Sequence, residues 1–69
     1  MNRSNEIVSL MWSEEGFLQA LEDWDLPKLK EMAEEVAFDL SARGGYPVMI
    51  DDQTWSDIRA YLNEDRKAI

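Results

Sequence analysis

The apolar positions between residues 27 and 43 follow a helical period more regularly than those of any other segment. They recur with the spacing i, i+3, i+4, i+7, i+8 and i+11, which places them on one face of an α-helix. These positions are Leu29, Met32, Ala33, Val36, Ala37 and Leu40. Pro27 suits the start of a helix, and Gly44 is the residue type that most often ends one. The pattern predicts a central helix over residues 27–43, against which the rest of the chain packs.

A shorter apolar segment lies near the N-terminus. It covers about 200° of a helical wheel, which is wider than one face. Its members are Ile7, Val8, Leu10, Met11 and Trp12. We expect a short helix over residues 5–12 with Ser4 or Asn5 as its cap, because either side chain can accept a hydrogen bond from a free backbone N–H. Such a wide apolar arc indicates either a central position in the bundle or contact with a second molecule, and we favour the second.

The next segment predicts a second helix. One unbroken helix as far as Trp24 would place the carboxylate of Glu14 in the middle of an apolar face, and burying that group unpaired is costly. Ser13 can instead cap a new helix whose first turn is acidic. Its apolar stripe is Phe17, Leu18, Leu21 and Trp24. We therefore predict a break and a second helix over residues 14–23, with a single helix over residues 5–24 as the alternative.

The segment after the central helix has extended character. Tyr46, Val48 and Ile50 alternate with other residues, which is the period of a β-strand. A single strand is not stable by itself. We therefore expect an extended linker over residues 44–52 that lies on the bundle, with pairing to a second copy of the chain as the alternative.

A last helix follows this linker. We expect Asp51, Asp52 or Thr54 to cap it, and Thr54 with Asp57 resembles a capping box in which Asp replaces the usual Glu or Gln. The buried stripe of this helix consists of Trp55, Ile58 and Leu62, flanked by Tyr61. After Asn63 the residues are polar, and we expect the chain to fray there.

Together these segments predict an all-α fold, a small bundle of three or four helices with a short extended linker before the last helix. The expected core is Ile7, Met11, Phe17, Leu18, Leu21, Leu29, Met32, Val36, Leu40, Ile58 and Leu62. The 69 residues suffice for one domain, so residues 1–69 are assigned to a single small helical domain. A core of this size supplies about 3–5 kcal/mol, and a partner is one common reinforcement.

Composition narrows the possible chemistry. The chain contains no Cys and no His, which excludes disulfides, thiolate chemistry and the common zinc ligand sets. Its adjacent carboxylates do not face each other on a helix, so we predict no enzyme activity, no cofactor and no metal site. No apolar run approaches the ~20 residues of a membrane span, and no secretion signal is recognisable. The expected location is the cytoplasm, without a membrane partner.

The formal net charge is −8, from 15 acidic and 7 basic side chains. A field of this sign repels nucleic-acid phosphates and attracts basic protein surfaces. Direct binding to nucleic acid is therefore not expected, although Trp55, Arg59 and Arg66 resemble the residues of a recognition helix. Solubility alone is the simpler explanation of the charge.

The outer face of the central helix carries the most distinctive polar pattern. Glu31, Glu35 and Asp39 follow one another at i, i+4 and i+8 and form an acidic row. Phe38 lies among them, about 160° from the middle of the apolar stripe, where an aromatic ring indicates contact with a partner. The alternatives are a solvated face and a neighbouring segment that covers the ring. The candidate partner-binding residues are Val8, Trp12, Glu31, Glu35, Phe38 and Asp39.

The sequence therefore predicts a non-enzymatic protein–protein interaction module. The expected partner is a second copy, giving a homodimer, or a larger basic protein that this small acidic protein regulates or inhibits. The alternative is an acidic DNA mimic that occupies the DNA-binding surface of another protein. The short, acidic and motif-free sequence would suit an accessory protein of a phage or a bacterium, with a host protein as partner.

Overall fold

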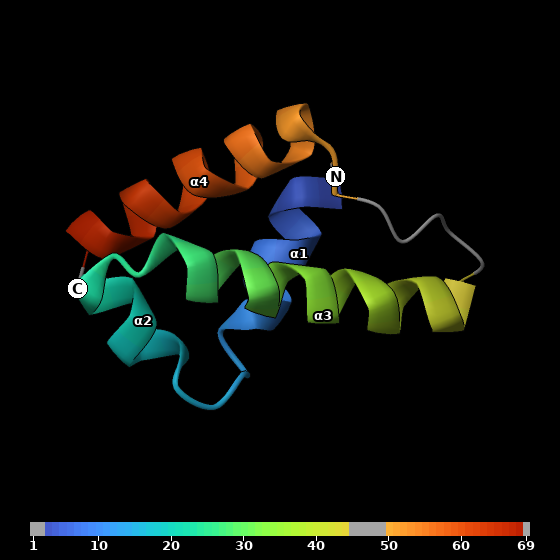
Figure 1. Cartoon of the computed structure of the whole chain (residues 1–69), viewed down its shortest axis with the longest axis horizontal. Coiled ribbons are helices and arrows are strands. Elements are labelled where there is room, and N and C mark those ends of the chain that lie inside the picture. The colour runs from blue at the N-terminus through green and yellow to red at the C-terminus, as the bar shows by residue number, and fades with distance from the viewer. Residues whose placement is uncertain (1–2, 45–49, 69) are drawn as a thin grey trace.

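The computed structural model of the chain describes residues 3–44 and 50–68. This part contains four helices, which are α1 (Arg3–Met11), α2 (Phe17–Asp23), α3 (Leu26–Gly44) and α4 (Asp52–Lys67). α1 and α2 each pack against both α3 and α4 (Figure 1). The predicted small all-α bundle is confirmed. The extended linker falls largely on residues 45–49, outside the described residues.

α1 is buried on two sides because both α3 and α4 cover it. Ile7, Val8 and Met11 are all buried as a result. A central position in the bundle thus accounts for three of the five residues of the wide apolar arc, whereas Leu10 and Trp12 stay 39% and 44% exposed. The predicted cap is wrong, since α1 begins at Arg3 and Ser4 is buried inside its first turn.

A turn over residues 12–16 separates α1 from α2, so the predicted break is confirmed. Within the turn the backbone N–H of Phe17 donates to the carbonyl oxygen of Glu14 at 3.2 Å. Gly16 has a φ of 82°, a left-handed conformation that glycine adopts without a steric penalty. The predicted cap at Ser13 is wrong, because this left-handed residue interrupts the helical path and α2 begins only after it.

A second left-handed residue, Trp24, ends α2 with a φ of 53°. The N–H of Asp25 donates to the carbonyl oxygen of Ala20 at 3.0 Å, which is the long hydrogen bond of a Schellman motif. Asp25 then caps α3, since its Oδ1 accepts from the N–H of Lys28 at 3.3 Å. The chain thus turns at residues 24 and 25, and α3 starts at Leu26, one residue earlier than expected.

Asp51 is the N-cap of α4, one of the three residues predicted for this role. Its Oδ1 accepts from the N–H of Thr54 at 2.8 Å. Thr54 is therefore a donor within the first turn, and the predicted capping box with Asp57 is wrong. The helix also continues to Lys67, well beyond the predicted fraying point at Asn63.

Two contacts hold the last turns of α4 against the rest of the bundle. The indole N–H of Trp12 donates to Oδ2 of Asp65 at 3.2 Å. The guanidinium carbon of Arg66 lies 5.0 Å from the ring centroid of Trp24, a cation–π geometry. These polar residues extend α4 because they contact the turn after α1 and the corner before α3, which the sequence periodicity does not reveal.

Most residues predicted for the core are buried in the structure. Those found buried are Ile7, Met11, Phe17, Leu21, Leu29, Met32, Val36, Ile58 and Leu62. Leu40 is partly buried against the same cluster. The prediction that Leu18 belongs to the core is wrong, since its side chain is 51% exposed. α2 buries Phe17, Ala20 and Leu21, and a residue next to Phe17 points about 100° away from that face.

Leu21 and Leu18 offer a matched test of this packing within one helix. We expect Leu21→Ala to lower the free energy of unfolding by about 2–5 kcal/mol, because the side chain is fully buried and its removal leaves a cavity. We expect Leu18→Ala to change it by about 0.5 kcal/mol or less. Urea unfolding followed by circular dichroism measures both values. Equal losses for the two variants would contradict the orientation of α2.

The cap of α4 predicts a dependence of stability on pH. The hydrogen bonds that Asp51 accepts from the hydroxyl and the backbone N–H of Thr54 lower the pKa of its carboxyl below the ordinary value of 3.8. A lowered pKa means that the carboxylate stabilises the fold above the unfolded-state value, and that this contribution is lost as the pH falls through the folded-state value. We expect Asp51→Asn to melt below the wild type at neutral pH.

The same comparison in acid provides the control. Because Asn keeps an acceptor oxygen without the charge, the difference in melting temperature between wild type and Asp51→Asn should shrink on acidification. Asp51→Ala should melt below both proteins at neutral pH, since it lacks any acceptor. A wild-type advantage that persists unchanged in acid would show that the charge of Asp51 is not its source.

Candidate partner-binding face of α3

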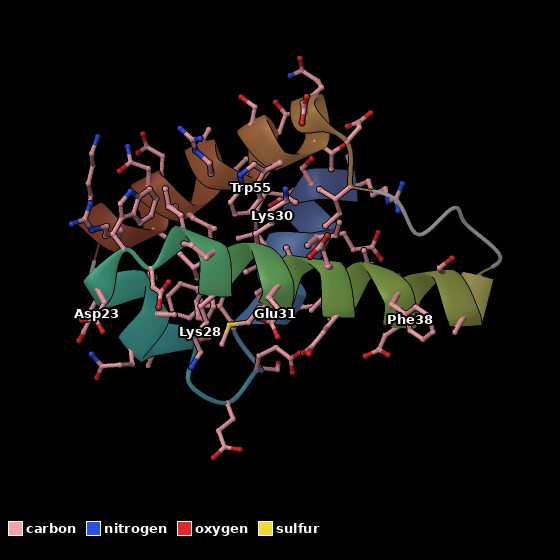
Figure 2. The ribbon with its side chains drawn as sticks, viewed as in Figure 1. Asp23, Lys28, Lys30, Glu31, Phe38 and Trp55 are labelled. Atoms are coloured by element: carbon pink, nitrogen blue, oxygen red, sulfur yellow. The ribbon has the colours of Figure 1, made fainter. Side chains whose placement is uncertain are left out.

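The acidic row of α3 consists of Glu31, Glu35 and Asp39, and all three side chains are exposed. Their spacing of four residues places them along one side of the helix. Figure 2 shows Glu31 and Phe38 on the side of α3 away from α4, whereas Lys30 lies on the side toward α4, near Trp55 of that helix. The acidic row thus begins, at Glu31, on the side of α3 that is turned away from α4, and none of its three side chains belongs to the buried core.

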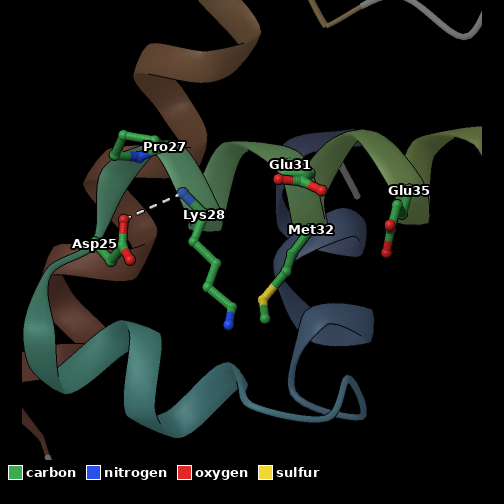
Figure 3. A pocket seen from close by; sticks show the side chains of 6 residues that line it. All are labelled: Asp25, Pro27, Lys28, Glu31, Met32 and Glu35. Atoms are coloured by element: carbon green, nitrogen blue, oxygen red, sulfur yellow. Dashed lines mark hydrogen bonds between the residues drawn. The ribbon is translucent and has the colours of Figure 1, made fainter.

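The larger of two hollows beside this row has a volume of about 480 Å³. It lies along the first half of α3 and is lined by Asp25, Pro27, Lys28, Glu31, Met32 and Glu35. Figure 3 shows the side chains of Lys28 and Met32 reaching from α3 toward the segment that leads into α2, with Met32 between Lys28 and Glu35. A Cβ atom on Gly16 would lie 3.8 Å from the methyl carbon of Met32, so the turn before α2 lies against the tip of that side chain.

The smaller hollow, of about 110 Å³, lies further along α3. Its lining residues are Leu10, Glu14, Val36, Asp39 and Leu40. Three of them are aliphatic, and one of these, Leu10, is 39% exposed although it belongs to α1. The acidic row joins the two hollows, since Glu31 and Glu35 line the first and Asp39 lines the second.

The charges around the hollows favour a cationic ligand. Among the described lining residues, the larger hollow has three carboxylates against one ammonium group, and the smaller has two carboxylates and no basic side chain. The carboxylates do not gather into a metal site, because no group of three or more ligating side chains close enough for one ion occurs among the described residues. Hollows that are lined by both apolar side chains and carboxylates suit a side chain with an apolar stem and a basic head group.

Phe38 remains exposed, as the partner-contact hypothesis requires. Its ring is 60% exposed, the largest value among the exposed large hydrophobic side chains of the described residues. It lines neither hollow but lies on the same outer face, three residues after Glu35 and next to Asp39. The alternative of a covering linker concerns residues 45–49, which lie outside the described part of the chain.

The two candidates from the N-terminal segment lie elsewhere. Trp12 is 44% exposed, but its ring packs on Phe17 with the centroids 5.0 Å apart and its indole N–H is bonded to Asp65. Val8 is only 4% exposed and belongs to the core. The structure therefore brings Glu31, Glu35, Phe38 and Asp39 together on α3, and does not bring Val8 or Trp12 to that face.

Sequence reasoning missed the residues that give this face its shape. Leu10, Glu14 and Met32 line the hollows, yet the sequence placed Met32 in the core, Leu10 in the first apolar segment and Glu14 in the first turn of the second helix. One signal was available, because the apolar arc of the first segment was too wide for one face and Leu10 lies at its edge. The pairing of Leu10 with α3 depends on tertiary structure alone.

No helix in the described residues has both the length and the apolar character needed to cross a membrane. Comparison of the chain with protein-family models, with curated proteins and with solved structures finds no match. A functional assignment therefore rests on the surface of α3.

Val8 and Phe38 allow the division between core and free surface to be tested. We expect Val8→Ala to lower the free energy of unfolding by about 2 kcal/mol, since it removes buried methyl groups. We expect Phe38→Ala to change it by about 0.5 kcal/mol or less, because the ring is mostly in water. Chemical denaturation of both variants measures this. A loss for Phe38→Ala as large as that for Val8→Ala would show that the ring is covered.

Proposed function

We propose that this protein is a non-enzymatic binding module that uses the outer face of α3 to bind a basic surface of a larger protein. The observation that supports this most directly is the position of the acidic row at the rim of two hollows with apolar side chains in their lining. Charge complementarity speeds association and selects partners, while apolar contact in a hollow slows dissociation. By binding such a surface, the protein would regulate or inhibit its partner.

The arrangement of the carboxylates favours this proposal over solubility as their only role. Charges that serve solubility need only be spread over the surface. Here Glu31, Glu35 and Asp39 form one row, and neighbouring like charges on a helix are unfavourable by a few tenths of a kcal/mol. A basic partner would turn that repulsion into attraction. Phe38 on the same face adds the kind of exposed aromatic side chain that is enriched at interface centres.

A homodimer through the same face is the less favoured form of the proposal. Two copies related by a twofold axis bring the same surface patch together. Each copy would then place its acidic row against the acidic row of the other, and among the described residues that line the larger hollow only Lys28 is basic. A basic protein of different sequence avoids this repulsion.

A DNA mimic is a narrower version of the same idea. The carboxylates of the row repeat every four residues, which is about 6 Å along the helix axis. Such a row could occupy part of a surface that normally binds phosphates. This version requires that the captured partner binds DNA and that the protein competes with that DNA.

The proposal predicts binding that depends on the acidic row and on salt. We expect the triple variant Glu31→Gln/Glu35→Gln/Asp39→Asn to lose most of its capture of basic proteins from an extract of the source cell, at least about tenfold by quantitative mass spectrometry. Capture by the wild type should weaken as salt rises, because the screening length falls from about 10 Å at 0.1 M to about 3 Å at 1 M.

A second triple variant provides the control for net charge. Glu15→Gln/Glu22→Gln/Glu64→Gln removes three exposed carboxylates from other parts of the surface. It should capture the same proteins as the wild type. If the two variants lose capture equally, the binding depends on overall charge and not on the acidic row. If the α3 variant captures as much protein as the wild type, the proposed site is refuted.

A further inference from the structure

The two hollows beside the acidic row differ in chemistry, and this difference defines the ligand more narrowly than charge alone. A ligand defined in this way rests on the proposed function, because it would bind the same face of α3. The larger hollow contains the Met32 side chain under the carboxylates of Glu31 and Glu35. The smaller hollow is mainly aliphatic.

The larger hollow suits the side chain of Arg or Lys. The stem of such a side chain packs on apolar atoms while its charged head stays at a polar rim, and the flexible thioether of Met32 adapts to what lies on it. Glu31 and Glu35 are one helical turn apart and supply acceptors for the head. Lys28 does not occupy this position, since its ammonium lies toward Gly16, on the other side of Met32 from Glu35.

The smaller hollow suits one aliphatic side chain. Leu10, Val36 and Leu40 line it, and its volume of about 110 Å³ is of the order of a single side chain. Glu14 and Asp39 at its edge would face the positively charged residues that flank such an anchor. Within the described residues Leu10 is among the most exposed large apolar side chains, so covering it removes apolar surface from water.

The spacing of the hollows and the all-helical fold indicate the form of the ligand. Val36 follows Met32 by one helical turn and Leu40 by two, roughly 6 and 12 Å along the axis. Residues four or seven apart on a helix present their side chains on one face, roughly 6 and 10.5 Å apart along the axis. An extended peptide usually binds by adding to the edge of a sheet, and residues 3–44 and 50–68 contain no strand.

We infer that the partner contributes a basic amphipathic helix that places an Arg or Lys stem on Met32 and an aliphatic side chain between Leu10 and Leu40. Recognition then requires both anchors on one face of the partner helix, four or seven residues apart. Basic charge without the aliphatic anchor leaves the smaller hollow empty and binds more weakly.

Synthetic peptides of about 18 residues, long enough to form helix, test this inference without knowledge of the partner. The first carries one Leu flanked by Arg four and seven residues away on both sides, so that either orientation fits, with Lys and Ala elsewhere. The second replaces that Leu by Ala. The third moves the Leu to the opposite face. All three have the same charge, and calorimetry gives their dissociation constants for the full chain.

We expect the first peptide to bind about tenfold more tightly than the other two, as covering one aliphatic side chain predicts. Leu10→Gln should remove that advantage. Leu18→Gln is the matched control, because Leu18 is an exposed leucine that lines neither hollow. With methyl-labelled methionine, the NMR signal of Met32 should shift on binding, whereas that of the fully buried Met11 should not.

The possible failures are distinguishable. Equal binding of the three peptides, still weakened by the triple variant of the acidic row, would overturn the two-anchor inference and leave the proposed function intact. A Leu-dependent advantage that survives Leu10→Gln would also overturn it. Binding of all three peptides that is indifferent to the triple variant and to salt, or no binding at low salt, would refute both the inference and the proposed function.

Discussion

The burial of α1 on two sides is the constraint on which the rest of this structure depends. In a chain of 69 residues without cysteine, no disulfide limits the unfolded state, so apolar contact must hold the fold together. α1 supplies that contact to both long helices, because its apolar arc is wide enough to face α3 and α4 at once. A segment for which the sequence favoured contact with a second molecule therefore contributes Ile7, Val8 and Met11 to the core.

Two left-handed residues make this packing possible. Gly16 and Trp24 reverse the chain before and after α2, so that this short helix can contact both α3 and α4. The first reversal also places the turn before α2 against the tips of Met32 and Lys28. The connection that allows the core to form thus also contacts two residues that line the larger hollow.

Function, on this view, belongs to the side of α3 that the core does not need. The buried stripe of α3 is accounted for by helix packing, with small Ala33 and Ala37 fully covered by their neighbours. The exposed side carries a row of like charges and an aromatic ring, and the two hollows lie where this side meets Met32 and Val36 of the buried stripe. A basic amphipathic partner would resolve the repulsion and cover the apolar surface together.

The sequence by itself determined the helical class, the central helix, the break after α1 and most core residues, because periodic burial and local caps are properties of single segments. It also identified the acidic row and Phe38, which are set by spacing along one helix. Tertiary structure alone decided that Val8 is core, that Leu18 is exposed and that Leu10 meets α3. It also extended α4 to Lys67 through contacts with Trp12 and Trp24. Each of these depends on which helices become neighbours, and a pattern within one segment carries no information about that choice.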